Sequence, residues 1–521
     1  MTEDIYIKRY LMKNKLLNKN LIIACILSVL IAVAYIIIGN YKETLWLDEI
    51  YTYSLANNDA FEIFDESTRV YAGDEIIRDY MTVEEGHAFD FKMVYENQVK
   101  DVHPPLYYMF VHFFSSFAPY SYSRLYALVP NIIFAVIVYW QMVWMFKQFC
   151  KNKLLSLVFA GLYLFTMCFV NNVMLFRMYV LLTVMTNFLV IIFIKYKPWK
   201  QHTKWFYISL FFTILGGMQT QYYFSVIAAS VCLIYAVYLL YYKKIKELIL
   251  YVITGLAGVG ASIAVFPATL DHIFEGYRGE EAFQSFADSS LSNVKVLFEI
   301  FNRQLFGNMI LLIVAIIVVL LIVSLCKNNK VNSEIGYIML QITLPVVIYL
   351  CVISKVAPYL TDRYIFNVSG LLYISVFGIF LILADKFGKK GIMLSVLMAA
   401  AVLVSSYQDG IPYLNRYEED HRNAVAQMSS VPCVYVYSNS AYKCVPYYMD
   451  LADYDTVMLL AEWHEDYVDW WDYTDEDKLV IYLDTTDNST QVLDRIVKYS
   501  TTMTEYSKLY DAGGFSVYLV D

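Results

Sequence analysis

Apolar segments that are long enough to cross a membrane recur along most of this chain. The first runs from about Leu21 to Ile38, directly after a cluster of basic residues. A transmembrane helix needs about 20 mostly apolar residues to span the hydrocarbon core. Ten further segments approach or reach this length: Ser121 to Phe146, Leu154 to Val170, Met178 to Ile194, Trp205 to Gly217, Tyr222 to Tyr241, Leu248 to Phe266, Leu305 to Leu325, Ile335 to Ile353, Ile365 to Ala384 and Ile392 to Val404. We therefore expect a polytopic α-helical membrane protein with about eleven transmembrane helices.

The composition favours the same class of protein. The 521 residues are 59% hydrophobic and only 17% charged, whereas soluble proteins usually carry about 25% charged residues. The net charge of -9 argues against nucleic acid as a partner and leaves membrane lipids as the expected surroundings of the chain.

The distribution of basic residues predicts the orientation of the helices. Bulky aliphatic residues continue to Gly39 without a signal-peptide cleavage pattern, so we expect a retained first helix with a cytoplasmic N-terminus. The apolar segment from Pro104 to Phe117 is short for a span. If it spans, every later basic cluster falls outside; if it is an interfacial or re-entrant helix, all of them fall on the cytoplasmic side, as the positive-inside rule requires. These clusters are Lys147/Lys151/Lys153, Lys195/Lys197/Lys200/Lys204, Lys243/Lys244/Lys246, Lys327/Lys330 and Lys386/Lys389/Lys390. We therefore predict a multi-pass protein of a plasma membrane, with an interfacial helix in its first outer loop.

This topology places a long first loop, residues 40–120, and the C-terminal tail on the outer face. We expect residues 1–406 to form the transmembrane domain and residues 407–521 to form a small extracytoplasmic α/β domain. In the tail, the pattern predicts strands at 434–437, 479–483 and 515–520 and helices at 423–428 and 491–498. Cys433 and Cys444 lie in this region and could form a disulfide, although their spacing does not reveal their geometry.

An acidic pair stands near the start of the first loop, in the sequence Trp46-Leu47-Asp48-Glu49. Carboxylates are costly to keep ionised close to lipid, so a pair of them there is a candidate reaction site. The alternative interpretation is an ordinary solvated loop.

A second motif ends the loop, in the sequence Asp101-Val102-His103-Pro104-Pro105-Leu106-Tyr107-Tyr108. Two prolines can begin a helix without wasting backbone donors. His103 at this position would contact an acceptor or a phosphate; the alternative is a plain interfacial histidine within a belt of tyrosines.

Arginines in other outer loops supply the complementary charge. Arg177, Arg278 and Arg363 lie there, with Lys355 close to the last of them. A guanidinium group suits a phosphate because its planar fork donates two hydrogen bonds at once. Each arginine alone could instead anchor the chain at lipid headgroups. Three of them on the same face as an acidic pair favour a site for a lipid phosphate.

Taken together, these motifs resemble a known family. Trp46–Glu49, His103–Tyr108, Arg177–Tyr179 and Asp362–Tyr364 follow one another in an order that is similar to that of the GT-C membrane glycosyltransferases of the protein O-mannosyltransferase and lipid A aminoarabinose transferase type. The resemblance covers roughly residues 20–400, and it depends on the combination of the acidic motif with the His-Pro-Pro motif.

The resemblance implies transfer of a hexose or pentose from a polyprenyl phosphate to an extracytoplasmic protein, glycan or lipid, with inversion at the anomeric carbon. Asp48 would be the general base that takes the acceptor proton, a role that typically contributes about 100-fold to 10,000-fold, and Glu49 would assist it. The leaving phosphate would be stabilised by Arg177 and Arg363 and, after them, by Arg278 and Lys355. The remaining substrate contacts are expected from Trp46, His103, Tyr107, Tyr179, Gln221 and Tyr222.

One position departs from the family pattern. Gln221 stands where many relatives carry histidine, which puts in doubt a metal or acceptor contact at that point. We therefore assign no metal and no cofactor, although His87, His103 and His272 all lie on the predicted outer side.

Two other classes of protein fit parts of the pattern. A transporter or flippase of lipid-linked or envelope glycans would need charged or polar groups inside its spans, and the predicted spans are nearly free of charge. An outer sensor or adhesion protein would need far fewer helices as an anchor. We find no convincing internal repeat of the kind that many transporters contain.

Overall fold

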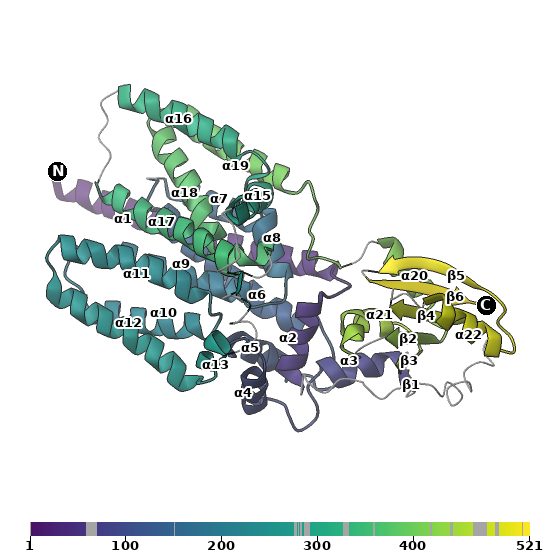
Figure 1. Ribbon diagram of the computed structural model, residues 1–521. Coiled ribbons are helices and arrows are strands. Elements are labelled where there is room, and N and C mark those ends of the chain that lie inside the picture. The colour runs from purple at the N-terminus through teal and green to yellow at the C-terminus, as the bar shows by residue number, and fades with distance from the viewer. Residues whose placement is uncertain are drawn as a thin grey trace. The chain divides into compact units, whose positions relative to one another are not determined.

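The structure is a computed structural model that describes most of the chain (Figure 1). The described residues are 2–58, 70–150, 152–275, 279, 281, 284–285, 292–326, 333–357, 360–416, 419–437, 441–461, 477–484, 489–512 and 514–521. The chain divides into two compact units, which we describe separately. Unit 1 comprises Met1–Gly39, Gln98–Tyr107 and Leu128–Pro412, and unit 2 comprises Asn40–Asn97, Tyr108–Ala127 and Tyr413–Asp521. Most of the first loop is thus grouped with the C-terminal tail, whereas the boundary expected from the sequence lay at residue 407.

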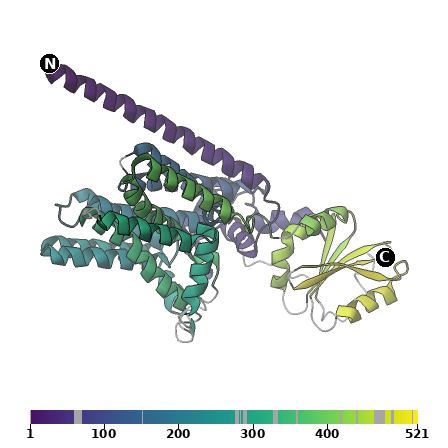
Figure 2. The same ribbon diagram turned by 90° about the horizontal axis from the view of Figure 1, so that it is seen from above.

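Unit 1 is built from helices (Figure 1, Figure 2). Their bounds are α1 Thr2–Asn40, α6 Leu125–Phe146, α7 Lys153–Leu164, α8 Met167–Met174, α9 Tyr179–Lys195, α10 Lys204–Met218, α11 Phe224–Tyr241, α12 Ile245–Val265, α13 Thr269–Phe274, α15 Ser292–Phe306, α16 Ile310–Cys326, α17 Ser333–Val356, η1 Asp362–Tyr364, α18 Phe366–Asp385 and α19 Gly388–Ser406.

Seven helices among the described residues are long and apolar enough to cross a membrane, and two bent pairs raise the number to nine if each pair is one span. The bent pairs are α7 with α8, at 60°, and α15 with α16, at 79°. The chain is therefore a polytopic helical membrane protein. The two other expected spans correspond to α9 and α10, which are apolar but only 17 and 15 residues long, so the count of about eleven stays a prediction.

Burial separates the helices of unit 1 into central and peripheral ones. In α18, 78% of the most apolar stretch is buried inside the protein, whereas in the first candidate span, Lys19–Asn40, only 17% is buried. Helix α18 packs against α9, α17 and α19. An apolar surface that is not buried by protein must face lipid in a membrane protein, so the first span is expected to lie at the edge of the bundle.

Unit 2 contains a six-stranded sheet with the strand order β1-β3-β2-β4-β6-β5. Strand β2 runs parallel to β3 and β4, whereas β6 is antiparallel to β4 and β5. The strands are β1 Val70–Ala72, β2 Cys433–Tyr437, β3 Thr456–Ala461, β4 Leu479–Asp484, β5 Tyr506–Ala512 and β6 Phe515–Val520. One face of the sheet packs its aliphatic residues, among them Val434, Leu460 and Ile481, against Leu493 and Ile496 of helix α22.

Unit 2 also contains helices, and some of these belong to it with only part of their length. They are α2 Leu47–Asn57, α3 Gly73–Met81, α4 Phe91–Lys100, α5 Leu106–Ser115, α20 Glu419–Gln427, η2 Ala441–Tyr447, α21 Tyr448–Leu451 and α22 Ser489–Tyr499. Helices α4 and α5 each cross the division between the units. Helix α5 occupies the segment expected to be an interfacial helix, while its position at a membrane surface stays a prediction.

The tail contains the elements that its sequence predicts and two strands that it did not. Strands β2, β4 and β6 and helices α20 and α22 match the expected segments, but β3 and β5 were not expected. In addition, β1 of the first loop pairs antiparallel with β3, with Val70 opposite Met458. Cys433 and Cys444 are both buried, free thiols, so the disulfide considered between them is not formed.

Candidate functional site

The acidic motif of unit 2 begins helix α2. The Glu49 amide donates to the Trp46 carbonyl oxygen at 2.8 Å, and the Trp46 amide donates to Glu49 Oε2 at 2.7 Å. Glu49 thus caps the helix from its third position, where it satisfies a backbone donor that precedes the first turn. Both carboxylates of the motif lie in the first turn, where the helix dipole favours negative charge.

Glu49 is also paired with a lysine. Lys42 Nζ lies 3.1 Å from both carboxylate oxygens of Glu49, and neither side chain has any exposed surface. Lys42 Nζ also donates to the Tyr413 carbonyl oxygen at 2.7 Å. Burial lowers the pKa of Lys42 from its ordinary value, and the charge of Glu49 offsets only part of that effect. Glu49 therefore has no exposed surface and caps the start of α2, while its expected role as an assistant of the base stays a prediction.

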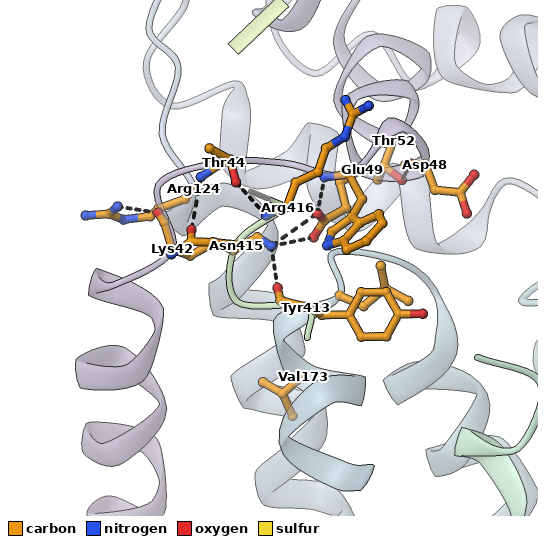
Figure 3. A network of polar contacts seen from close by, with 12 residues as sticks. Lys42, Thr44, Asp48, Glu49, Thr52, Arg124, Val173, Tyr413, Asn415 and Arg416 are labelled. Carbon is orange, nitrogen blue, oxygen red and sulfur yellow. Dashed lines mark hydrogen bonds and ion pairs between the residues drawn. The ribbon is translucent and has the colours of Figure 1, made fainter. Parts of the chain in front are cut away.

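Residues 413–416 hold the backbone that leads into α2 (Figure 3). Asn415 Oδ1 accepts from the Glu43 and Thr44 amides at 2.7 and 3.2 Å, and the Arg416 amide donates to Thr44 Oγ1 at 2.7 Å. Arg124 Nη1 donates to the Lys42 carbonyl oxygen at 2.6 Å. These bonds, together with the Lys42–Glu49 pair, form what we name the Lys42 cluster: Lys42, Glu49, Arg124, Tyr413 and Asn415.

Asp48 is the more accessible of the two acids. Its side chain is half-buried, and Figure 3 shows its carboxylate directed away from the Lys42 cluster. The neighbouring Trp46 ring meets the Tyr413 ring edge-on, with centroids 5.7 Å apart. The buried indole N–H of Trp46 has no acceptor among the described residues. The Asp48 carboxylate and the Trp46 indole N–H therefore both lie at the start of α2, next to the Lys42 cluster.

Unit 1 contains a second polar group, in which His103 links a carboxylate to a guanidinium. His103 Nδ1 lies 2.7 Å from Asp101 Oδ2, and His103 Nε2 lies 3.2 Å from Arg177 Nη2. A guanidinium group can only donate, so Nε2 accepts and the ring proton is assigned to Nδ1, which donates to Asp101. We name Asp101, His103 and Arg177 the His103 chain.

The His103 chain is in contact with solvent at one end. The side chains of Asp101 and His103 are 19% and 23% exposed, whereas Arg177 is 4% exposed. Burial alone would raise the pKa of Asp101, but the favourable electrostatic interaction with His103, the hydrogen bond from its Nδ1 and the positive charge of Arg177 outweigh it, so that the pKa lies below its ordinary value. Asp101 is thus held as a carboxylate that orients the ring toward Arg177.

Arg177 occupies the turn between α8 and α9. Helix α8 ends at Met174, and Asn131 Nδ2 donates to the carbonyl oxygens of Val173 and Leu175 at 3.0 and 3.3 Å. The four last carbonyl groups of a helix lack partners within it, so a side-chain donor there fixes how the chain leaves the helix. The position of Arg177 is therefore set by packing inside unit 1.

The segment around His103 also contacts other turns of unit 1. The Leu106 amide donates to the Gln219 carbonyl oxygen at 3.1 Å, in the turn between α10 and α11. His272 Nε2 donates to the Val99 carbonyl oxygen at 3.2 Å, so its Nδ1 accepts from the Tyr222 hydroxyl at 2.9 Å. The segment from Val99 to Leu106 thus includes His103 and is connected to Arg177 directly and to Tyr222 through His272.

The turn that carries Arg363 lies next to the same region. The rings of Tyr223 and Tyr364 meet edge-on at 5.4 Å, and Arg363 lies over the Tyr364 ring at 5.4 Å. Asp362 Oδ2 accepts from Gln304 Nε2 at 2.8 Å. Arg363 is therefore attached to the α10–α11 turn through two tyrosines.

Other predicted residues have different settings. Tyr107 has no exposed surface and donates its hydroxyl to Asn131 Oδ1 at 3.0 Å, and the substrate contact expected of it stays a prediction. Gln221 is 6% exposed and accepts from the Tyr222 amide at 2.6 Å. Tyr179 begins α9, and Lys355 lies in the last turn of α17. Arg278 lies outside the described residues.

Lys42, Asp101 and His272, which take part in these contacts, were not among the site residues predicted from the sequence. A glutamate three residues after Trp46 is typical of a helix cap, and this pattern could have identified Glu49 as a capping residue. Asp101 stands two residues before His103, but adjacency alone does not reveal a hydrogen bond.

Comparisons with known proteins do not assign the chain to a family: no protein-family model matches it, and no curated protein matches it. Among the described residues, no three histidine, cysteine, aspartate or glutamate side chains come together as a group that could hold a metal ion.

Proposed function

We propose that this protein is an integral membrane glycosyltransferase, which moves a sugar from a polyprenyl phosphate to an acceptor hydroxyl outside the cytoplasm with inversion at the anomeric carbon. The observation that carries the proposal is that the two acidic residues of the motif differ in burial and in pairing. Glu49 is sealed in an ion pair with Lys42, while the neighbouring Asp48 keeps accessible surface. A buried ion pair adds little to net stability, so we infer that this pair serves to position the residues beside it.

In the proposed reaction Asp48 is the general base. It takes the proton of the acceptor hydroxyl as that oxygen forms a bond to the anomeric carbon. The bond between the anomeric carbon and the phosphate oxygen breaks, and polyprenyl phosphate leaves with the electron pair. A carboxylate in this role typically contributes about 100-fold to 10,000-fold.

Arg177 and Arg363 would stabilise the negative charge that grows on the leaving phosphate. The His103 chain supports this role for Arg177, because a guanidinium held in a fixed orientation loses little further freedom when it binds an oxyanion. Fixed donors aimed at developing charge are often the largest single contribution to catalysis. Trp46, with its buried indole N–H, would donate to a substrate hydroxyl.

The experiment measures release of polyprenyl phosphate from a panel of polyprenyl-phosphate sugars by the purified protein in detergent, with an envelope extract as acceptor. We expect Asp48→Asn to lower release by about 100-fold or more and to leave the thermal unfolding temperature unchanged. Asp74→Asn is the matched control, because Asp74 is an exposed aspartate in the first turn of α3 in the same unit. Release that is equally fast in the Asp48→Asn variant would overturn the proposal.

A transporter or flippase of lipid-linked glycans is the second candidate, and one observation favours it. Two helix pairs are bent, at 60° and 79°, and discontinuous helices often form the substrate sites of transporters. Transport does not need a proton acceptor at Asp48. Movement of a lipid-linked glycan across proteoliposome membranes that is unaffected by Asp48→Asn, without release of polyprenyl phosphate, would select this function over the first.

A further inference from the structure

A small cavity lies in unit 1 where the middle of α1 meets α6 and α7. Its volume is about 280 Å³, and its apolar wall includes Leu21 and Ala24 of α1, Trp140 of α6 and Leu157 of α7. Asn20 and two basic residues, Lys147 and Lys153, complete the lining. This volume is at the lower end of the range for small-molecule sites, so the cavity has room for part of a larger molecule.

The helix bounds place this cavity at a membrane boundary. The first candidate span begins at Lys19, and Lys147 directly follows the span Leu125–Phe146. Lys153 is the first residue of α7. The ends of three apolar segments therefore meet at the cavity, and the basic groups stand where the hydrocarbon gives way to lipid headgroups. Ala24 and Leu157 lie about one turn further into their helices, and Trp140 about two turns, so the apolar wall extends toward the hydrocarbon.

The charge at the mouth of the cavity is positive. Both lysine side chains are exposed, and within the described part of the chain neither ammonium group takes part in an ion pair or a side-chain hydrogen bond. The pKa of Lys147 is lowered, first by its partial burial and then by the positive charge of Lys153. Both lysines line the same cavity, so their positive charges repel each other, and an anion between them would relieve that repulsion.

We propose that this cavity binds an anionic glycerophospholipid, with its phosphate between Lys147 and Lys153 and the first part of one acyl chain against Leu21, Ala24 and Trp140. The combination of a positive rim and an apolar wall at a membrane boundary matches an amphiphile with an anionic head. A basic pocket between transmembrane helices is a known physical solution for holding such a headgroup. The site is independent of the residues assigned to glycosyl transfer.

The test compares binding of phosphatidylglycerol and phosphatidylcholine to the purified full-length protein by native mass spectrometry. We expect tighter binding of phosphatidylglycerol, and about 30-fold weaker binding of that lipid by Lys147→Gln/Lys153→Gln, since each basic residue near an anionic headgroup contributes about fivefold. Lys389→Gln/Lys390→Gln removes the same charge from two exposed lysines of α19 and is expected to bind as the wild type does.

A second measurement places the acyl chain. Phosphatidylglycerol with brominated acyl chains is expected to quench part of the tryptophan fluorescence, and Trp140→Phe is expected to lose that part. Equal binding of the two lipids, unchanged binding in Lys147→Gln/Lys153→Gln, or the same loss in the control pair would overturn the proposal. Quenching that is unaltered by Trp140→Phe would overturn the placement of the chain in this cavity.

Discussion

The Lys42 cluster of unit 2 and the His103 chain of unit 1 both use a carboxylate to hold a cation, but they do so in opposite surroundings. Lys42 and Glu49 are sealed, and the ammonium group is shared between the carboxylate and a backbone carbonyl. Asp101 and His103 keep exposed surface, and a neutral imidazole separates the carboxylate from the guanidinium. A sealed contact pair maintains the shape of the backbone around it, whereas an accessible chain can orient a charge for a ligand.

The largest effect is expected when the sealed pair is broken. Lys42→Met would leave Glu49 buried without its partner, which typically costs about 3–5 kcal/mol. Thermal and denaturant unfolding in detergent measure the loss. Lys42→Met/Glu49→Gln should recover most of it, because no uncompensated charge remains. Lys92→Met, at an exposed ion pair with Glu96, is the control, and we expect a change within about 0.5 kcal/mol. A stable Lys42→Met protein would contradict this view of the cluster.

A smaller effect, on turnover, is expected at the cation of the accessible chain. Arg177→Met should lower the release of polyprenyl phosphate by about 100-fold to 1,000-fold, as is typical when one donor to a developing oxyanion is removed. Arg303→Met removes an arginine of the same unit whose side chain is 52% exposed and paired with Asp409, and it should have little effect. Turnover within twofold of the wild type in Arg177→Met would remove this arginine from the proposed mechanism.

His103 is expected to act through Arg177, with a smaller effect. His103→Gln keeps a polar group but shortens the link, and we expect a decrease in turnover of about tenfold, which corresponds to about 1.4 kcal/mol. The same change in the Arg177→Met background should have almost no further effect, because residues that act as a unit are not additive. Full additivity in this double-mutant cycle would mean that the two side chains work separately.

The smallest effect concerns acid stability. The pKa of Asp101 in the folded protein lies below its ordinary value of 3.8, so ionised Asp101 stabilises the fold above that pH, and this contribution is lost as the pH falls through the folded pKa. The unfolding temperature of the wild type should therefore decrease more steeply below about pH 4 than that of Asp101→Asn. Parallel pH profiles for the two proteins would show that Asp101 does not provide this stabilisation.

The helical part of the fold was readable from the sequence because long apolar runs have few alternatives. The tail was only partly readable. Strand β3 (Thr456–Ala461) is a short apolar run, which fits a buried strand or a piece of helix equally well. Strand β5 (Tyr506–Ala512) is polar and lies at the edge of the sheet, and β1 has only three residues. An edge strand is stabilised by pairing with a strand that can be distant in sequence, and the local sequence pattern does not reveal that partner.

The part of the candidate site that could be predicted consists of reactive residue types that stand in short sequence motifs. Asp48, His103 and Arg177 were selected from their residue types and their predicted side of the membrane, and the structure joins the last two directly. The different burial of Asp48 and Glu49 was not predictable, because Glu49 pairs with a lysine whose ammonium group also donates to the carbonyl oxygen of Tyr413, about 370 positions later. Tyr107 was chosen as an interfacial aromatic residue, but the packing of α5 against Asn131 buries it.

The bonds from residues 413–416 to residues 41–44 also determine when the start of α2 can be completed. The two segments are separated by about 370 residues, and at synthesis rates of about 5–20 residues per second the later one emerges roughly 20–75 s after the earlier one. During that interval Lys42 lacks the carbonyl oxygen of Tyr413 as a partner, and the backbone of residues 41–44 lacks the side chain of Asn415. These contacts of the first loop can therefore form only after the last fifth of the polypeptide has begun to emerge. A chain that is truncated before residue 413 would contain the acidic motif without the hydrogen bonds that hold the backbone before it.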